Sequence, residues 1–247
     1  MARDYLFVIG GSSDIAGALL EKYLADRPDR SAVALSRSES ERLAALQERF
    51  PGRLSTVTCD LADSNAVADC VGSVREQHGV PSAIVPFAGS KLRLERFAKW
   101  DAAHVELDMR IQVLAVAQIM RGLLPEMARA SARTKVVFVL SSVTHGVPPK
   151  YMSMYVVTKF AQWGLMRALA AEYSGTSVCV NAVCPRMVRT KFLADLPEKA
   201  VEMAASKAPA GRLLSPGTVA DAIAFLLSPA ANHVHGAELL VTDGEVF

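Results

Sequence analysis

Several absences narrow what this sequence of 247 residues can be. No stretch approaches 18 consecutive apolar residues, so we predict no membrane-spanning helix and no membrane partner. The 27 basic and 25 acidic residues nearly balance, and no long basic run indicates a nucleic-acid surface, so no nucleic-acid partner is predicted. Hydrophobic residues make up 51% of the chain, which excludes a disordered protein and predicts a buried core.

Cysteine is scarce, and nothing in its spacing indicates a metal site or a redox motif. The four cysteines form no CxxC pair, so we expect buried free thiols and a reducing, cytoplasmic location: Cys59, Cys70, Cys179 and Cys184. His233 and His235 have no third ligand nearby in the sequence, so no metal is predicted. The apolar run Tyr5–Ile9 lacks a clear cleavage site after it, and we interpret it as a buried strand rather than a signal peptide.

Short apolar runs alternate with longer helical patterns along the chain. This alternation predicts right-handed βαβ units and hence an α/β, Rossmann-type doubly wound parallel sheet flanked by helices. Without a linker or repeat, residues 1–247 are expected to form a single domain, with an irregular segment near 185–215 acting as a substrate lid. The predicted strands are Tyr5–Ile9, Ala32–Ser36, Leu54–Thr58, Ala83–Phe87, Lys135–Leu140, Ser177–Val183 and Leu239–Thr242. The predicted helices lie near Asp14–Ala25, Glu39–Arg49, Ser64–Gln77, Ala102–Ala130, Met154–Tyr173, Glu198–Ser206 and Thr218–Leu227.

The first predicted strand runs directly into a turn of small residues, Gly10-Gly11-Ser12-Ser13-Asp14-Ile15-Ala16-Gly17. A strand, a tight turn and a helix start can present backbone N–H groups and the helix dipole to a pyrophosphate. An ordinary βα turn is the alternative, so this signal is weak alone. Because a carboxylate would repel phosphate, we interpret Asp14 as a helix cap that points away from it.

The end of the second predicted strand distinguishes between two nicotinamide cofactors. An acidic residue there would bind the ribose 2′-hydroxyl of NAD, whereas the sequence has Ser36 and Arg37. A guanidinium can pair with a 2′-phosphate, which favours NADPH over NAD. A solvated surface arginine is the alternative. After the third strand, Asp60 is placed to contact the adenine amino group.

The most specific pattern is a serine after the fifth strand, Ser142, followed by Tyr155 and Lys159. Tyrosine and lysine four residues apart share one face of a helix. A free phenol has a pKa of about 10, and a neighbouring ammonium lowers it. Tyr155 is then a proton donor to an alkoxide that forms as hydride reaches a carbonyl carbon. Ser142 would orient the carbonyl oxygen, and Lys159 would also bind the nicotinamide ribose.

Together these motifs resemble the short-chain dehydrogenase/reductase family over essentially the whole chain. The matching segments also include Ala88-Gly89, Asn181–Pro185 and Val241–Gly244. The resemblance implies seven parallel strands, NAD(P) dependence and a homodimer or homotetramer. Gly211–Ala220 is most similar to the 3-oxoacyl-carrier-protein reductase branch, although this ending is widespread. The cofactor contacts that the resemblance and the motifs imply are Gly10, Ser12, Ser13, Asp14, Ile15, Ser36, Arg37, Asp60, Leu61, Ala88, Gly89, Tyr155, Lys159, Pro185, Val188 and Thr190.

Four positions depart from the family pattern. Asp14 replaces a glycine of the turn, and Pro86 replaces an asparagine that ties neighbouring strands together. Gln112 aligns with the fourth catalytic residue of the family, an asparagine, and keeps its amide. Arg186 replaces a glycine next to the nicotinamide. We therefore predict four catalytic residues: Ser142, Tyr155, Lys159 and Gln112.

Three residues are predicted to contact the substrate. Arg186, with Arg189 and Lys191, forms a basic group that would attract an acidic substrate or the phosphate arm of a carrier-bound thioester; solvated charges are the alternative. His145 and Met152 lie in the loop after Ser142, where they either contact substrate or serve as a loop histidine and a core methionine.

The sequence therefore predicts an NADPH-dependent enzyme that reduces a ketone, with a carrier-bound or free β-ketoacyl thioester favoured over a small or cyclic ketone. Two alternatives stay open. One is a degenerate cofactor-binding scaffold or partner subunit, and the other is an alcohol dehydrogenase or isomerase that uses the same groups.

Overall fold

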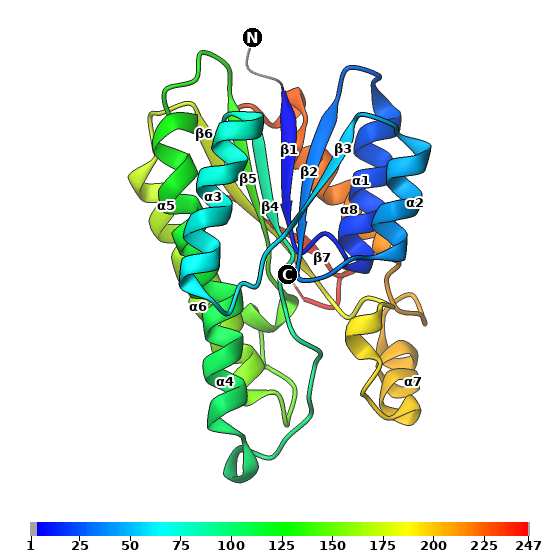
Figure 1. Cartoon of the computed structure of the whole chain (residues 1–247). Coiled ribbons are helices and arrows are strands. Elements are labelled where there is room, and N and C mark those ends of the chain that lie inside the picture. The colour runs from blue at the N-terminus through cyan, green and yellow to red at the C-terminus, as the bar shows by residue number, and fades with distance from the viewer. Residues whose placement is uncertain (1–3, 247) are drawn as a thin grey trace.

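The structure is a computed structural model that describes residues 4–246 and contains one parallel β-sheet (Figure 1). Its strands are β1 (Tyr5–Ile9), β2 (Ser31–Ser36), β3 (Leu54–Thr58), β4 (Ala83–Pro86), β5 (Thr134–Val139), β6 (Val178–Pro185) and β7 (Glu238–Val241). Each corresponds to a predicted strand. The spatial order is β3-β2-β1-β4-β5-β6-β7, which is the doubly wound, Rossmann-type sheet that the alternating pattern predicts.

Helices cover both faces of the sheet. One face is covered by α1 (Asp14–Asp26), α2 (Glu41–Arg49) and α8 (Pro216–Leu227), and the other by α3 (Ser64–His78), α5 (Ala115–Met127) and α6 (Ser153–Glu172) (Figure 1). Each face buries its own apolar cluster, which explains why the central strands are apolar throughout. All five residues of β1 and all eight of β6 are buried.

The predicted long helix over Ala102–Ala130 is not continuous. It consists of α4 (Ala102–Met109), a π-helical turn η2 (Arg110–Leu114) and α5. A π-helical turn has no signature in apolar periodicity, because it adds a residue to one turn without breaking the helix. It contains Gln112, the predicted equivalent of the family asparagine.

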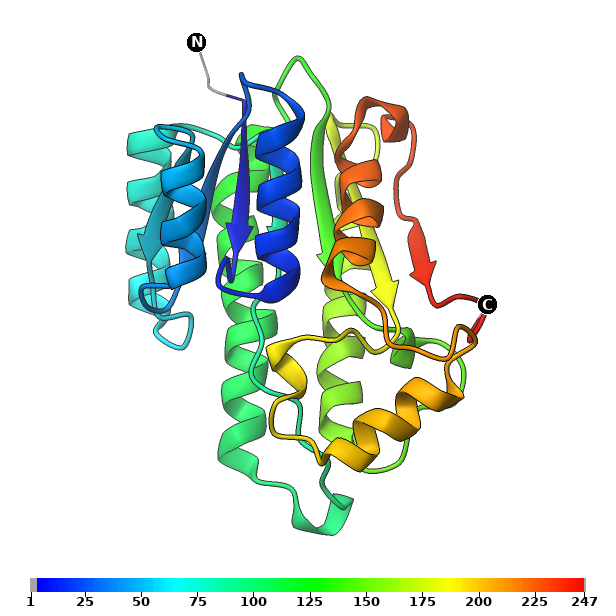
Figure 2. The ribbon, with the colours of Figure 1, turned by 90° about the vertical axis from the view of Figure 1, so that its right-hand side faces the viewer.

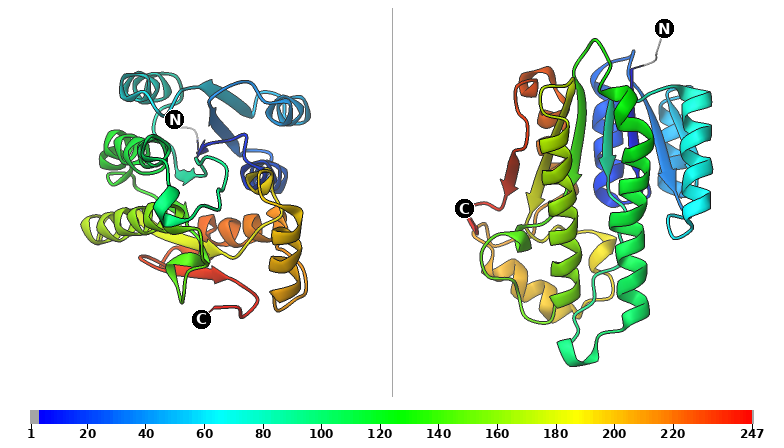
Figure 3. Two further views of the ribbon diagram at one scale, coloured as in Figure 1. Left: turned by 90° about the horizontal axis from the view of Figure 1, so that it is seen from below. Right: turned by 90° about the vertical axis from the view of Figure 1, so that its left-hand side faces the viewer.

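The neighbouring strands β1 and β4 mark the point where the strand order reverses. In such sheets ligands bind outside the carboxyl ends of the strands at this point. The helix α7 (Glu198–Lys207) and its flanking loops lie beyond these carboxyl ends, as do parts of α4 and α6 (Figures 2 and 3). The predicted lid segment therefore lies at the edge where a ligand is expected.

Pro86 affects the sheet next to this crevice. It pairs in register with Ile9, and the next N–H, from Phe87, donates to the Ile9 carbonyl at 2.7 Å. Proline has no N–H to donate. Strand β4 pairs with β5 at only two positions, Ala83 with Lys135 and Ile84 with Val136, so the two strands are unpaired toward their carboxyl ends.

The cysteine prediction is confirmed, since all four thiols are free and buried. Among the described helices, none combines the length and the hydropathy needed to cross a bilayer.

Gly10 provides a test of the turn that follows β1. Its φ is +85°, and a Cβ there would lie 2.8 Å from the backbone nitrogen of Ala88. We predict that Gly10→Ala lowers the free energy of unfolding by about 2–4 kcal/mol, because strain and a backbone clash add together. The matched control is Gly52→Ala, where φ is +70° but no atom lies within 4 Å. It should cost about 1–2 kcal/mol by urea denaturation, and equal losses would contradict the role of the Ala88 contact.

Candidate active site

The turn between β1 and α1 is closed by Ser13 rather than by Asp14. The Ser13 hydroxyl accepts a hydrogen bond from the Ala16 N–H, which makes Ser13 the helix cap. The predicted capping role of Asp14 is therefore wrong. Its carboxylate accepts from the Arg42 guanidinium and from the Lys191 N–H, each at 2.5 Å. Burial opposes the charge, but these two donors outweigh it and lower the pKa of Asp14.

The predicted cofactor residues all lie at the carboxyl edge of the sheet. Most lie at or just after the ends of β1, β2, β3, β4 and β6, and Tyr155 and Lys159 lie on α6, which follows β5, so segments that are far apart in the sequence end at the same edge of the sheet. Leu61 and Val188 are 8% exposed and belong to the apolar clusters, which leaves mainly their backbone groups to face a ligand. Ser12, Arg37 and Asp60 are exposed. Asp60 also accepts a hydrogen bond from the Ala62 N–H within its own turn.

The residues around this turn fit a dinucleotide with phosphate groups. Within residues 4–246, Nη1 of Arg42 is a buried donor without a hydrogen-bond partner, although Nη2 of the same side chain pairs with Asp14. Arg37 adds a second, exposed cation at the end of β2. Gly10 and Gly11 have no Cβ, so their backbone packs directly on Ala88 and Ala34. An unpartnered guanidinium N–H beside a helix N-terminus suits an anionic ligand.

The predicted catalytic serine, tyrosine and lysine lie on two elements that contact each other, the short helix η3 (Ser142–Thr144) and α6. Ser142 begins η3, and Tyr155 and Lys159 lie on α6. Lys159 Nζ is 5.8 Å from the centre of the Tyr155 ring and donates to the Val139 carbonyl at 3.2 Å. The hydroxyl that hydrogen-bonds to the phenol belongs to Ser141, the residue before the predicted Ser142. Sequence spacing did not single out Ser141, because both serines end the same strand.

Burial controls the ionisation of this group. It raises the pKa of Tyr155 above its usual range, and the hydrogen bond with Ser141 offsets this only in part. Burial also lowers the pKa of Lys159 to about 8. The expectation that Lys159 lowers the pKa of Tyr155 is therefore not met in the protein alone, because both groups lose solvation. The phenol therefore stays protonated at neutral pH.

A glutamine that the sequence analysis missed completes the network. The amide of Gln162 accepts from Lys159 Nζ at 2.8 Å and donates to the backbone carbonyl of Gln112 at 2.9 Å. Gln112 and Gln162 are each 3% exposed. The carbonyl of Gln112 belongs to the π-helical turn, where the regular hydrogen-bond pattern is interrupted. The spacing of Gln162 three residues after Lys159, on the buried face of α6, was the available signal.

An open cleft with about 500 Å³ of empty space leads to Tyr155. His104, Asp108 and Gln112 line it from successive helical turns, a spacing of four residues that the sequence analysis also missed. His104 lies 3.5 Å from Asp108, which also accepts from the Ser90 hydroxyl. Met152, a predicted substrate contact, lies in the lining of this cleft. Other apolar and aromatic residues of the lining are Leu92, Phe97, Trp100 and Phe192.

Arg186 does not reach this cleft. Its side chain is 2% exposed, and Nη2 donates to Asp243 Oδ2 at 2.8 Å and to the Arg212 carbonyl at 2.7 Å. The predicted contact between Arg186 and an acidic substrate is therefore contradicted. Its charge is already paired with a carboxylate that the sequence places 57 residues away, so the sequence pattern could not show the pairing.

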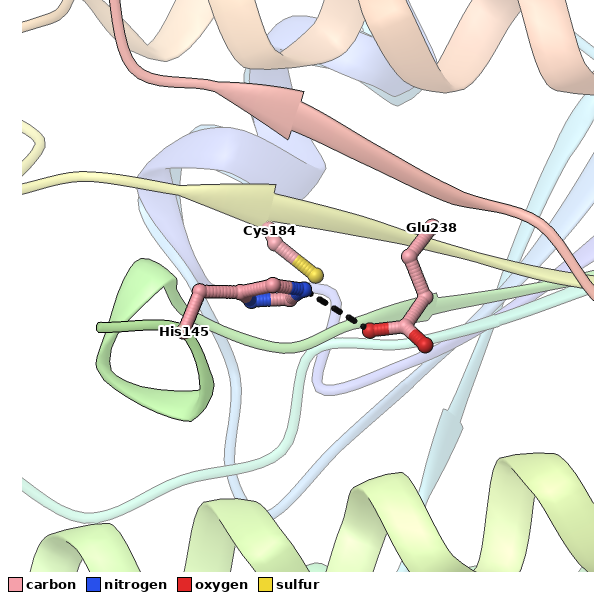
Figure 4. Close-up of side chains that lie close together, drawn as sticks. All are labelled: His145, Cys184 and Glu238. Carbon is pink, nitrogen blue, oxygen red and sulfur yellow. Dashed lines mark ion pairs between the residues drawn. The ribbon is translucent and has the colours of Figure 1, made fainter. Parts of the chain in front are cut away.

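His145 also lies away from the cleft. Its Nε2 is 3.2 Å from Glu238 Oε2, and the ring lies beside the buried Cys184 (Figure 4). The predicted substrate contact of His145 is thus replaced by a contact with β7. Burial, with a contribution from Glu238, raises the pKa of Cys184 to about 12. His235, in contrast, uses both ring nitrogens in backbone contacts with Val180 and Ala170, which leaves none for a metal.

Comparison with known proteins places this geometry in a family. A family model described as enoyl-(acyl carrier protein) reductase matches residues 29–245. The chain belongs to the short-chain dehydrogenase/reductase family. It is 30% identical to 2-(R)-hydroxypropyl-CoM dehydrogenase of Xanthobacter autotrophicus, over 96% of each chain. It is 26% identical to the 3-oxoacyl-[acyl-carrier-protein] reductase of Thermotoga maritima, over 97% of this chain and 96% of the other.

A solved structure shows the same fold. The 3-ketoacyl-(acyl-carrier-protein) reductase of Brucella melitensis, complexed with NADH, superimposes with a TM-score of 0.88 at 21% identity, over 99% of this chain and 98% of the other. The present chain is accordingly an oxidoreductase of a nicotinamide-dependent family. The predicted family, fold and enzyme class are confirmed.

Burial of the Lys159 ammonium makes the stability of the protein depend on pH. Unfolding returns Lys159 from a pKa of about 8 to 10.5, so its burial as a cation costs about 3 kcal/mol below pH 8. Between pH 8 and 10.5 the unfolded chain binds more protons, and this group makes stability rise with pH. We predict that Lys159→Met stabilises the cofactor-free protein at pH 7 by about 1–3 kcal/mol, and that this gain shrinks toward pH 10.

Urea denaturation of both proteins between pH 7 and 10 checks this prediction. Lys207→Met, an exposed lysine at the end of α7, is the control and should show no such pH-dependent gain. A gain for Lys159→Met that stays constant with pH would show that Lys159 is not buried as a cation.

Proposed function

We propose that this enzyme is an NADPH-dependent carbonyl reductase. The observation that carries the proposal is the cleft that ends at the half-buried Tyr155, whose phenol stays protonated beside the cation of Lys159. A proton donor and a positive charge at one point suit a carbonyl oxygen that becomes an alkoxide. When bound, the nicotinamide supplies the hydride for the carbonyl carbon.

Each residue of the network has a separate role in this proposal. Tyr155 gives its proton to the developing alkoxide. Ser141 and Ser142 offer hydroxyl groups at the same strand end, and the contact of Ser141 with the phenol keeps the phenol oriented. Lys159 provides the positive potential, while the Val139 carbonyl and Gln162 hold its ammonium in place. Gln112 anchors Gln162 through its carbonyl and also lines the cleft.

The preference for NADPH rests on two arginines near the end of β2. Arg37 replaces the acidic residue that would bind a ribose 2′-hydroxyl. Arg42 lies against Gly17 of α1 and has a buried donor without a partner within the described residues. Asp14 neutralises part of this charge through Arg42, which weakens but does not remove the attraction for a phosphate.

The lining of the cleft supports a ketone with a compact apolar body. Phe97, Trp100 and Phe192 offer aromatic surface, and Phe192 packs on the ring of Tyr155 with 5.9 Å between the ring centres. Because Arg186 is paired internally, the charge argument for a carrier-bound β-ketoacyl thioester is weaker than the sequence indicated. The thioester and the compact or cyclic ketone are both candidate substrates. The compact or cyclic ketone is preferred, because the cleft is lined by apolar and aromatic side chains.

The exposed apolar side chains on the helices beside the cleft support a homodimer or homotetramer. Leu107 on α4, Leu114 on η2, and Val157 and Phe160 on α6 are 40–58% exposed, and α6 contacts both α4 and η2. A helix face that is apolar and exposed in the monomer suits pairing with a second copy of the chain.

Replacement of the phenol tests the proposed reaction. Tyr155→Phe should lower kcat for ketone reduction at least about 100-fold, because the proton donor is lost, while cofactor affinity stays within a few-fold of the wild type. The assay follows NADPH oxidation with a panel of cyclic ketones and β-ketoacyl thioesters, and the reverse reaction with the matching alcohols. Tyr151→Phe, a cleft tyrosine that is 50% exposed, is the control and should keep its activity.

Near-wild-type turnover of Tyr155→Phe would remove Tyr155 from the mechanism. Cofactor binding without turnover of any ketone or alcohol by the wild type would favour the scaffold alternative.

The choice of cofactor depends on Arg37. We predict that Arg37→Ser lowers kcat/KM for NADPH by about 10–100-fold and leaves that for NADH within a few-fold, because only NADPH carries the 2′-phosphate. Arg129→Ser, an exposed arginine after α5, is the control for loss of surface charge. Equal losses with both cofactors would contradict a contact between Arg37 and the 2′-phosphate.

A further inference from the structure

Three potential metal ligands come together at one edge of the sheet, outside the cleft (Figure 4). His145 lies in the loop after β5 and η3, Cys184 lies on β6 and Glu238 begins β7, so two neighbouring strands and the loop after a third contribute one ligand each. A nitrogen, a sulfur and a carboxylate oxygen of these residues lie within 4.8 Å of one another. The cluster takes no part in the proposed reduction, and the inference drawn from it does not depend on that function.

The hydrogen bonds around His145 orient its ring toward this cluster. The Thr144 hydroxyl donates to the Ser141 carbonyl at 2.9 Å, so its oxygen is left to accept from the ring N–H at Nδ1, 3.1 Å away. With the proton on Nδ1, the lone pair of Nε2 faces Glu238 and Cys184. A second contact that fixes the tautomer in this way is typical of histidines that bind metals.

The carboxylate of Glu238 has an oxygen atom that lacks a hydrogen-bond donor among the described residues. Its Oε2 atom is buried and has no hydrogen-bond donor among residues 4–246, although Nε2 of His145 is only 3.2 Å away. The ring nitrogen and the carboxylate oxygen are therefore close without pointing at each other. Two ligands of one ion have this relation, because each points at the ion rather than at the other ligand.

We propose that His145, Cys184 and Glu238 bind a zinc ion through Nε2, Sγ and a carboxylate oxygen. Ligand atoms around a tetrahedral zinc lie roughly 3.3–3.8 Å apart, given bond lengths of about 2.0–2.3 Å. The His145–Glu238 distance is already close to this range, and the other separations need a shift of about an ångström or less. Nitrogen and thiolate ligands exclude calcium and magnesium, and water completes the fourth position.

The ion replaces the thiol proton of Cys184 on binding, and this proton passes to solvent. The bound zinc ion joins the loop that carries Ser141 and Ser142 to β6 and β7. The proposed role is structural, since the ion fixes the position of the serine loop without contact to the cleft residues. The alternative is a direct ion pair between His145 and Glu238 with no metal bound, and finding it would contradict the zinc proposal.

Cobalt substitution tests the site without reference to activity. Wild-type protein that has been treated with a chelator should bind one Co²⁺ per chain, with a sulfur-to-cobalt charge-transfer band and the visible bands of a tetrahedral ion. One equivalent of Zn²⁺ should displace the cobalt. Cys184→Ala should abolish the charge-transfer band, and Glu238→Gln and His145→Gln should weaken Zn²⁺ binding. Thr144→Val should weaken it about 10–100-fold, because the histidine loses its orienting contact.

Two matched variants keep the test decisive. Cys179→Ala, a buried cysteine on the same strand with its thiol near the Asn232 carbonyl, should leave the band unchanged. A triple variant with Cys59, Cys70 and Cys179 changed to alanine keeps Cys184 alone and should retain the band, which decides the question even if Cys184→Ala fails to fold. The proposal is overturned if wild-type protein shows no sulfur-to-cobalt band, or if the band survives in Cys184→Ala.

Discussion

The site depends on the burial of one cation. Lys159 lies between α6 and the sheet, and its side chain is only 9% exposed. Its ammonium can therefore donate hydrogen bonds only to groups that the fold places around it. The Val139 carbonyl, the Gln162 amide and the nearby charge of Asp108 supply those groups. A buried charge without such partners would be neutralised or would unfold the protein. The π-helical turn at Gln112 and the packing of α6 on the sheet serve this requirement, because they bring an acceptor to the ammonium or to its partner.

Opposite charges elsewhere in the chain show the same principle of local compensation. Asp14 introduces a carboxylate at the phosphate turn, and Arg42 and the Lys191 N–H hold it. Arg186 introduces a guanidinium after β6, and Asp243 pairs with it. In both cases a residue that departs from the family pattern has a partner from a distant loop. The departures therefore change how the loops at the carboxyl edge of the sheet are held together, and neither of them involves α6.

The fold and the placement of Tyr155 and Lys159 on one helix could be predicted from the sequence because their signals are local. Apolar runs such as Tyr5–Ile9 fix strands through burial on both faces, and Tyr155 and Lys159 share a helix face through their spacing. Capping at Ser13, the serine that contacts the phenol and the role of Gln162 could not be predicted in this way. Each depends on a contact between groups whose relative positions the spacing of residues does not set.

The sequence by itself determined the parallel sheet, the nicotinamide-dependent family and the Tyr155–Lys159 pair, since periodicity and motif spacing are properties of neighbouring residues. Only the tertiary structure decided which charges are free. It buried Arg186 against Asp243, turned His145 toward Glu238 and Cys184, and joined Gln162 to Lys159. These pairings join residues on different strands and loops, and their order across the sheet, rather than their order along the chain, brings them together.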